Sequence, residues 1–148
     1  MPHFKGTDFE IELPTEFTDE STYAFAFRAR SDFRPSITVK TERLKEPTEL
    51  PAYVEKQLEN IKKLLPDVAV VSGAPAKHGD CPAHISIYDW GDKARRVRQK
   101  QHYILLKHPD RVVTLTGTSL RETFDQTEEL FDAVFRSFKP IEQHRKGA

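Results

Sequence analysis

The clearest pattern in the chain is a pair of β-rich runs joined by a short polar turn. Residues 97–106 and 111–118 flank the tripeptide His-Pro-Asp. Proline fixes φ and aspartate accepts hydrogen bonds from the backbone that follows it, so both residues favour a turn. Two strands with this connection predict an antiparallel hairpin. The second run is β-branched and nearly uncharged, which is typical of a central strand.

The first run of this hairpin changes character along its length. Because side chains alternate along a strand, its beginning has two different faces. One face carries Arg96, Arg98 and Lys100, and the other carries Val97, Gln99, Gln101 and Tyr103. Residues 104–106 are apolar on both faces. We therefore expect a strand that begins in contact with water and ends in the core.

Three shorter runs in the first 42 residues also alternate between apolar and polar positions, which predicts strands at 8–13, 22–28 and 36–42. We expect one face of the first two to point inward, with Phe9, Ile11, Leu13, Tyr23, Phe25 and Phe27. The outward face of the second and third strands consists of small or hydroxylated residues, including Thr22, Ala24 and Thr38. A freely solvated face would carry Lys and Glu, so this composition favours a surface that contacts another molecule.

Two segments switch to helical periodicity. The first, 50–65, has an apolar stripe of Leu50, Tyr53, Val54, Leu58, Ile61, Leu64 and Leu65. Pro51 suits its first turn and Thr48 is a candidate cap. The second, 125–138, has a stripe of Leu130, Phe131, Val134, Phe135 and Phe138, with Asp125 and Glu128 as a capping box.

The remaining runs predict strands at 68–72 and 83–90, joined by a segment rich in Gly and Pro. The predicted order is βββ-α-ββββ-α, with short connections. We therefore expect an α+β fold, in which a largely antiparallel curved β-sheet is partly covered by two amphipathic helices. A chain of 148 residues without a linker or repeat predicts one domain, 1–148.

Composition narrows the function classes. Lys and Arg number 23, as do Asp and Glu, so zero net charge gives no support to a nucleic-acid partner. The single cysteine, Cys81, excludes an internal disulfide and fits a reducing compartment. No apolar secretory segment is visible near the first residues and no apolar run is long enough to span a membrane. We expect a cytoplasmic protein that does not insert into the membrane.

The candidate chemical groups each favour a structural reading. His78, Cys81 and His84 are zinc-ligand types, but they lack a fourth ligand and a standard spacing. Cys81 also lacks the glycine-rich elbow or helix N-terminus that would activate a nucleophile, so we expect a buried, inert thiol. No phosphate-binding glycine motif is present. The sequence therefore predicts no catalytic residue, no metal and no cofactor.

A basic run marks the start of the hairpin: Lys93, Arg95, Arg96, Arg98 and Lys100. Such a run can bind phosphate, but with zero net charge and no aromatic side chains on that face it favours a solvated hairpin edge. Gln57 on the first helix and Gln101 in the hairpin border apolar side chains. Taken alone they read as surface polar residues, although amides in that position can also hydrogen-bond a partner.

Several segments resemble a known family. The segments that carry the resemblance are FEIELP, YVEKQLENIKKLLPD, RQKQHYILLKHPDRVVTLTGTS and FRSFKP. Their pattern resembles the Eag-type chaperones, which belong to the DcrB-like family and have a fold similar to PsbP. The resemblance covers essentially the whole chain. It implies a homodimeric accessory protein of bacterial type VI secretion. Such a protein binds the N-terminal transmembrane helices of an effector carrying a PAAR domain and shields them before loading onto the secretion spike.

The resemblance also implies a partner-binding surface. Its matching positions are Gln57, Gln101, Thr22, Ala24, Thr38, Ile61, Leu65 and Val97. Gln99 and Tyr103, which share the Val97 face of the hairpin strand, complete the candidate partner-binding site. Thr22, Ala24 and Thr38 depart from the large aliphatic residues that a binder of apolar helices should carry. That departure keeps open an alternative, a DcrB-like adaptor whose partner is less hydrophobic and unconnected with type VI secretion. An enzyme is the rival from another class, and it would need a polar constellation in a closed pocket.

Overall fold

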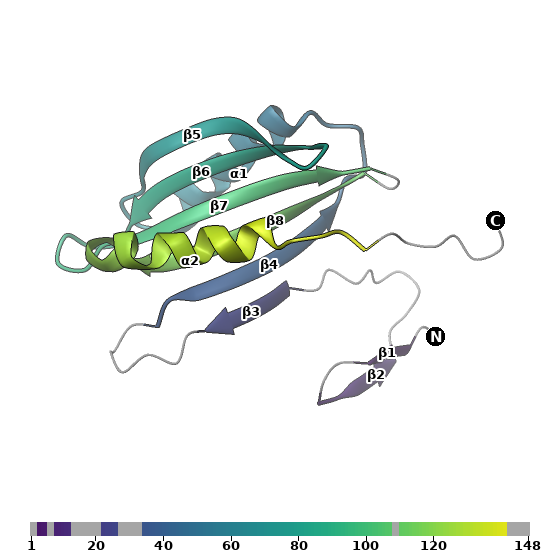
Figure 1. Ribbon diagram of the computed structural model, residues 1–148, viewed down its shortest axis with the longest axis horizontal. Helices are drawn as coiled ribbons and strands as arrows, with labels where there is room; N and C mark the ends of the chain where they lie inside the picture. Colours follow the sequence, from purple (N-terminus) through teal and green to yellow (C-terminus); the bar gives the residue numbers. More distant parts are fainter. Residues whose placement is uncertain (1–2, 6–7, 13–21, 27–33, 108–109, 142–148) are drawn as a thin grey trace.

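The fold is a single large antiparallel sheet with one helix on each face (Figure 1). The computed structural model describes residues 3–5, 8–12, 22–26, 34–107 and 110–141. Its elements are β1 His3–Lys5, β2 Glu10–Glu12, β3 Thr22–Ala26, β4 Ser36–Arg43, α1 Leu50–Leu64, β5 Ala69–His78, β6 Cys81–Trp90, β7 Val97–Leu106, β8 Arg111–Leu120 and α2 Phe124–Arg136. A single 3-10 turn, Arg121–Thr123, leads into α2.

The sheet has six strands in the order β3-β4-β8-β7-β6-β5, and every neighbouring pair is antiparallel. The predicted α+β class and the order βββ-α-ββββ-α are confirmed, with β8 central as its composition indicates. The short β1 was not predicted, and it pairs with β2 in a separate two-stranded hairpin. None of the described helices is long and apolar enough to cross a membrane.

One face of the sheet forms the main core with α2. The helix buries Phe124, Phe131 and Phe135 against the sheet. The sheet residues beneath them are Ile37, Ala83, Ile104, Leu106, Val113 and Leu115. Apolar side chains at three- and four-residue spacing place these three rings on one side of the helix. The predicted aromatic stripe is thus confirmed, although Leu130 and Val134 remain 37% and 40% exposed.

The opposite face forms a second, smaller core with α1. Leu50, Tyr53 and Val54 of the helix pack on Tyr103, Leu105 and Val112 of the two central strands. Only the first half of the predicted apolar stripe is therefore buried. Leu58, Ile61 and Leu65 are half-buried, and Leu64 is 81% exposed.

Several local predictions are wrong at the chain's beginning. Phe9 and Ile11 are 57% and 46% exposed, so β2 does not bury them as predicted. Tyr23 and Phe25 are 59% and 60% exposed because β3 is the edge strand, farthest along the sheet from β5. Leu13 and Phe27, which were assigned to the same inward faces, lie outside the described residues.

The predicted helix caps and one predicted connection also differ. Helix α1 is capped at Glu49 and α2 at Thr123, neither with a side-chain hydrogen bond, so Thr48 and the Asp125–Glu128 box are not caps. The Gly- and Pro-rich segment expected to join two strands is itself strand. It extends β5 and β6 into a long hairpin that turns at Gly79, where φ is 60°, a value that glycine adopts readily.

Candidate partner-binding face

Strand register brings the predicted site residues of the sheet to one face. Residues paired across antiparallel strands point to the same side. One row joins Ala24, Thr38, Thr116 and Gln101 across four strands. A neighbouring row of paired residues joins Thr22 to Tyr103 across the same four strands. Gln99 and Val97 alternate with the residues between them on β7, so they point to the same side of the sheet as Gln101. This is the face that α1 covers, because Tyr103 packs against that helix. We call it the α1 face.

Helix α1 adds the remaining predicted residues. It runs antiparallel to β7. Leu50, at the start of the helix, packs with Leu105 near the end of β7. The carbonyl oxygen of Asp67, just after the helix, accepts a hydrogen bond from Arg96, just before β7. Gln57, Ile61 and Leu65 fall between these two ends, on the helix side that carries Tyr53 and Val54. All three are half-buried. Thus the predicted site residues lie together, on one face and its covering helix.

The two sheet glutamines are held by hydrogen bonds within the chain. Gln101 donates from Nε2 to Thr116 Oγ1 at 3.2 Å and accepts at Oε1 from the Tyr103 hydroxyl. Gln99 donates from Nε2 to Thr118 Oγ1 at 2.8 Å and accepts at Oε1 from Trp90 Nε1 at 3.1 Å. Each glutamine thus keeps one Nε2 hydrogen and one Oε1 lone pair without a hydrogen bond among the described residues. The pair can therefore offer both donors and acceptors.

Two tyrosines secure this arrangement beneath α1. Tyr53 donates to a carboxylate oxygen of Glu42, and its ring meets that of Tyr103 edge-on at 6.2 Å between centroids. Burial raises the pKa of Tyr53, and the hydrogen bond and charge of Glu42 raise it further. Burial also raises the pKa of Tyr103. Both phenols are thus protonated donors at any physiological pH.

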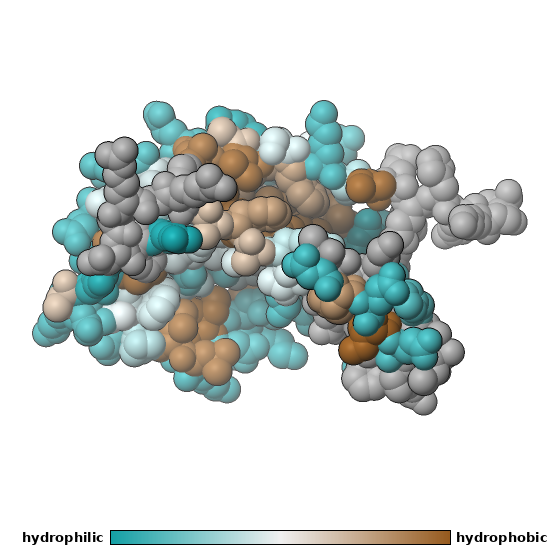
Figure 2. Space-filling model, turned by 90° about the horizontal axis from the view of Figure 1, so that it is seen from below, coloured by the Kyte–Doolittle hydropathy of each residue, from teal (hydrophilic) through white to brown (hydrophobic). Residues whose placement is uncertain are grey.

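The predicted residues differ in how far they reach the surface. Tyr103 and Val97 are only 2% and 7% exposed, and Gln101 is 9% exposed, so they form the floor of the α1 face. Thr22 and Ala24 are exposed, and Thr38 and Gln99 are half-buried. The accessible part is therefore the hydroxylated strip over β3, β4 and β8, next to the half-buried end of α1. Seen from below, the molecule shows hydrophobic patches separated by residues of intermediate hydropathy (Figure 2).

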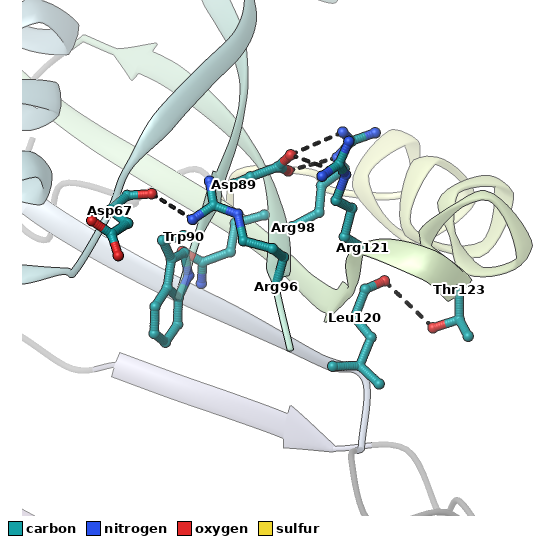
Figure 3. A network of polar contacts seen from close by, with 9 residues as sticks. Asp67, Asp89, Trp90, Arg96, Arg98, Leu120, Arg121 and Thr123 are labelled. Atoms are coloured by element: carbon teal, nitrogen blue, oxygen red, sulfur yellow. Dashed lines mark hydrogen bonds and ion pairs between the residues drawn. The ribbon is translucent and has the colours of Figure 1, made fainter. Parts of the chain in front are cut away.

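The basic run lies in a different environment from the predicted solvated edge. Because β7 is an inner strand, two of its cations lie under or beside α2. Lys100 is 12% exposed and pairs with Glu128 and Asp132 of that helix at 3.0 and 2.7 Å. Arg98 makes a two-point contact with buried Asp89, at 2.7 and 3.0 Å (Figure 3). These pairs were not predictable from the local sequence because the acidic partners lie on other elements.

The candidate zinc ligands do not assemble. Among the described residues no group of three His, Cys, Asp or Glu side chains is arranged to hold a metal. His78 Nε2 instead lies 2.6 Å from the carbonyl oxygen of Phe138, just beyond α2. Cys81 is half-buried against the α2 core.

Comparison with known proteins identifies the family. A family model described as DcrB matches residues 9–137, most of the chain. The chain belongs to the DcrB family. None of the curated protein sequences that were compared matches this DcrB-family protein.

Solved structures show the fold. A Pseudomonas aeruginosa protein of unknown function, PA94, is 20% identical, with a TM-score of 0.75 over 97% of this chain and 99% of the other. Mycobacterium tuberculosis LpqN, described as involved in cell envelope biogenesis, is 17% identical, with a TM-score of 0.55 over 81% and 82%. Cyanobacterial PsbP from Synechocystis is 12% identical, with a TM-score of 0.53 over 95% and 92%. This DcrB-family protein therefore has the PsbP-like fold that was predicted.

Proposed function

We propose that this DcrB-family protein is a cytoplasmic, non-enzymatic chaperone of the Eag type. It would bind the N-terminal transmembrane helices of a PAAR-containing effector and shield them before they are loaded onto the type VI secretion spike. The observation that carries the proposal is the α1 face itself. Eight residues matched through the family resemblance, together with Gln99 and Tyr103, lie on this face or on the α1 helix that covers it. The second half of that helix buries few of its apolar side chains.

The α1 face can offer an apolar helix both apolar area and hydrogen-bonding groups. Ile61 and Leu65 are half-buried, so a second helix laid beside them would remove further apolar area from water. Each Å² of that area contributes about 25 cal/mol. Threonines of β4 and β8 present methyl groups and hydroxyls together, a surface that small residues of a helix can approach closely. The unused amide hydrogens of Gln99 and Gln101 suit backbone carbonyls or hydroxyls of the bound chain.

A second candidate follows from the composition of the accessible strip. Thr22, Ala24 and Thr38 are small or hydroxylated, and the Gln101 amide is already hydrogen-bonded inside the chain. A DcrB-like adaptor for a less hydrophobic partner, outside type VI secretion, would use the same face. The nature of the bound segment separates the two candidates.

Co-expression with the N-terminal region of a PAAR effector encoded by a neighbouring gene tests the proposal. We expect the effector segment to be insoluble alone and to co-purify with this protein. The double variant Ile61→Asp with Thr38→Arg should lose it, because both changes put charge on the α1 face. Val134→Asp is the matched control for Ile61→Asp, since it puts the same negative charge on an exposed apolar position of α2, on the opposite face of the sheet.

The outcomes separate the candidates. The chaperone proposal is contradicted if the effector segment stays soluble without this protein. It is also contradicted if the double variant and the Val134→Asp control retain the segment equally. Retention of a polar partner through the α1 face, with no affinity for the apolar segment, supports the adaptor instead. Light scattering tests the proposed homodimer, which would have twice the 17.1 kDa mass of the chain.

A further inference from the structure

A cavity of about 600 Å³ lies at the end of the sheet where β6 turns into β7, beyond the α1 face. It is lined by Asp67, Val68, Lys93, Arg96 and Arg121. The lining thus includes three cationic residues and one acidic residue, in a chain whose formal net charge is zero. We propose that this cationic pocket binds the carboxylates of an acidic segment of a partner protein.

Arg96 is held in place for such a contact. Its Nη1 donates to the carbonyl oxygen of Asp67 at 2.6 Å (Figure 3). The same nitrogen donates to the carbonyl oxygen of Gly91 at 2.7 Å. The backbone around it is closed by hydrogen bonds from Gly91 to Pro66 and from Arg121 to Arg96, both 2.9 Å. These contacts fix one side of the guanidinium and leave Nη2 and Nε without a hydrogen bond to any described residue. A fixed, planar pair of N–H groups matches the geometry of a carboxylate.

Arg121 is also incompletely engaged. Its Nε lies 3.6 Å from Asp89 Oδ2, which is longer than a hydrogen bond. Both oxygens of Asp89 are already bound by Arg98 (Figure 3). The Arg121 side chain is 58% exposed, so its donors remain accessible to a ligand. Lys93 is exposed as well, and it forms no ion pair within the described part of the chain.

The lining favours a polypeptide carboxylate over a phosphate. Asp67 lowers the net positive charge of the lining, so the pocket attracts a doubly charged phosphate less than three cations alone would. Half-buried Val68 adds an apolar wall that can contact the methylene groups of a Glu side chain. A nucleic acid would need an extended series of basic residues, whereas this pocket gathers three.

NMR titration with capped hexaglutamate, using the ¹⁵N-labelled protein, tests the proposal. We expect saturable shifts at the amides of Lys93, Arg96 and Arg121 and at the indole of Trp90, the only tryptophan. The affinity should fall as salt is added, because exposed charges are screened. The double variant Lys93→Glu with Arg121→Glu should bind at least about tenfold more weakly, since it reverses two of the three cations.

Lys77→Glu is the matched control, because it reverses an exposed charge near the far end of the β5–β6 hairpin. It should bind as the unaltered protein does, and hexaglutamine should produce no shifts. Arg96 is left intact in these variants because its hydrogen bonds hold three backbone segments. The proposal is overturned by an absence of shifts at these amides, by equal weakening in the Lys77 variant, or by a preference for inorganic phosphate over the peptide. None of these outcomes bears on whether the α1 face binds an effector helix.

Discussion

The ring of Phe131 in α2 lies directly over Gly117 in β8, and a Cβ atom placed on Gly117 would come within 2.6 Å of that ring. Phe131 is fully buried in the core between α2 and the sheet, so moving its ring would disturb the packing around it. Gly117→Ala should therefore lift α2 from the sheet and lower the free energy of unfolding by about 1–3 kcal/mol. Urea unfolding followed by circular dichroism measures this loss.

Gly73→Ala is the matched control for that prediction. A Cβ at Gly73 would lie 3.4 Å from His84 Nε2, which is the far end of a side chain that can adjust. The change should leave stability within about 0.5 kcal/mol, as is usual for substitutions away from tight packing. If the two alanine variants unfold at the same urea concentration, Phe131 does not pack on Gly117 as described.

Asp89 and Arg98 provide a second prediction. The Asp89 side chain is 7% exposed and joins Arg98 through two short contacts. Arg98 is held protonated in turn, since the hydrogen bonds that it donates to Asp89 raise its pKa. Asp89→Asn would leave that guanidinium partly buried without its counter-charge, and should cost about 3 kcal/mol of unfolding free energy. Asp80→Asn, at an exposed hairpin turn, should have almost no effect, and equal losses in the two variants would contradict the prediction.

The fold was predictable from sequence because its main elements carry strong local patterns. The hairpin of β7 and β8 combines β-branched runs with a turn, and both helices repeat apolar residues at three and four. The predictions failed where tertiary context decides. The alternation of Tyr23 and Phe25 reads as a buried face, but β3 lies at the sheet edge, where their rings are mostly exposed. The second half of β5 was not predicted as a strand because it is rich in Gly and Pro. Pairing with β6 overrides the local preference of those residues.

The candidate face was predictable in a different sense. No local pattern links Gln57, Thr38 and Gln101, which lie on a helix and two separate strands; the family resemblance grouped them, and strand register explains how the two sheet residues come to one face. Their hydrogen bonds were not predictable. The partners of Gln101 include Thr116, which is distant in sequence and becomes a neighbour only when β7 pairs with β8.

Helix α1 buries apolar side chains in its first half and leaves its second half more exposed, which gives a third prediction. Leu50 is 5% exposed in the smaller core, whereas Leu64, on the same helix, is 81% exposed. Leu50→Ala should lower the free energy of unfolding by about 2–5 kcal/mol, because it leaves a cavity. Leu64→Ala should change it by less than about 0.5 kcal/mol. Chemical denaturation of the two variants makes the comparison, and a large loss for Leu64 would show that the chain itself uses that end of the helix.

The last prediction concerns acid stability and His102. This histidine packs against Phe135 with 4.7 Å between ring centroids, and its buried Nε2 has no hydrogen-bond partner within the described residues. Burial, with a contribution from the charge of Lys100, lowers its pKa from 6.5 to about 4. Between these values the unfolded chain takes up a proton that the folded chain does not. Stability should therefore fall as pH drops from 6.5 toward 4.

His102→Phe removes this titration while keeping an aromatic ring against Phe135. Its unfolding free energy should depend less steeply on pH across that range than that of the unaltered protein, as measured by urea titrations at several pH values. His3→Gln, which alters an exposed histidine, is the control and should keep the original slope. Parallel pH curves for the unaltered and His102→Phe proteins would mean that His102 titrates normally, and that its ring is not shielded by α2.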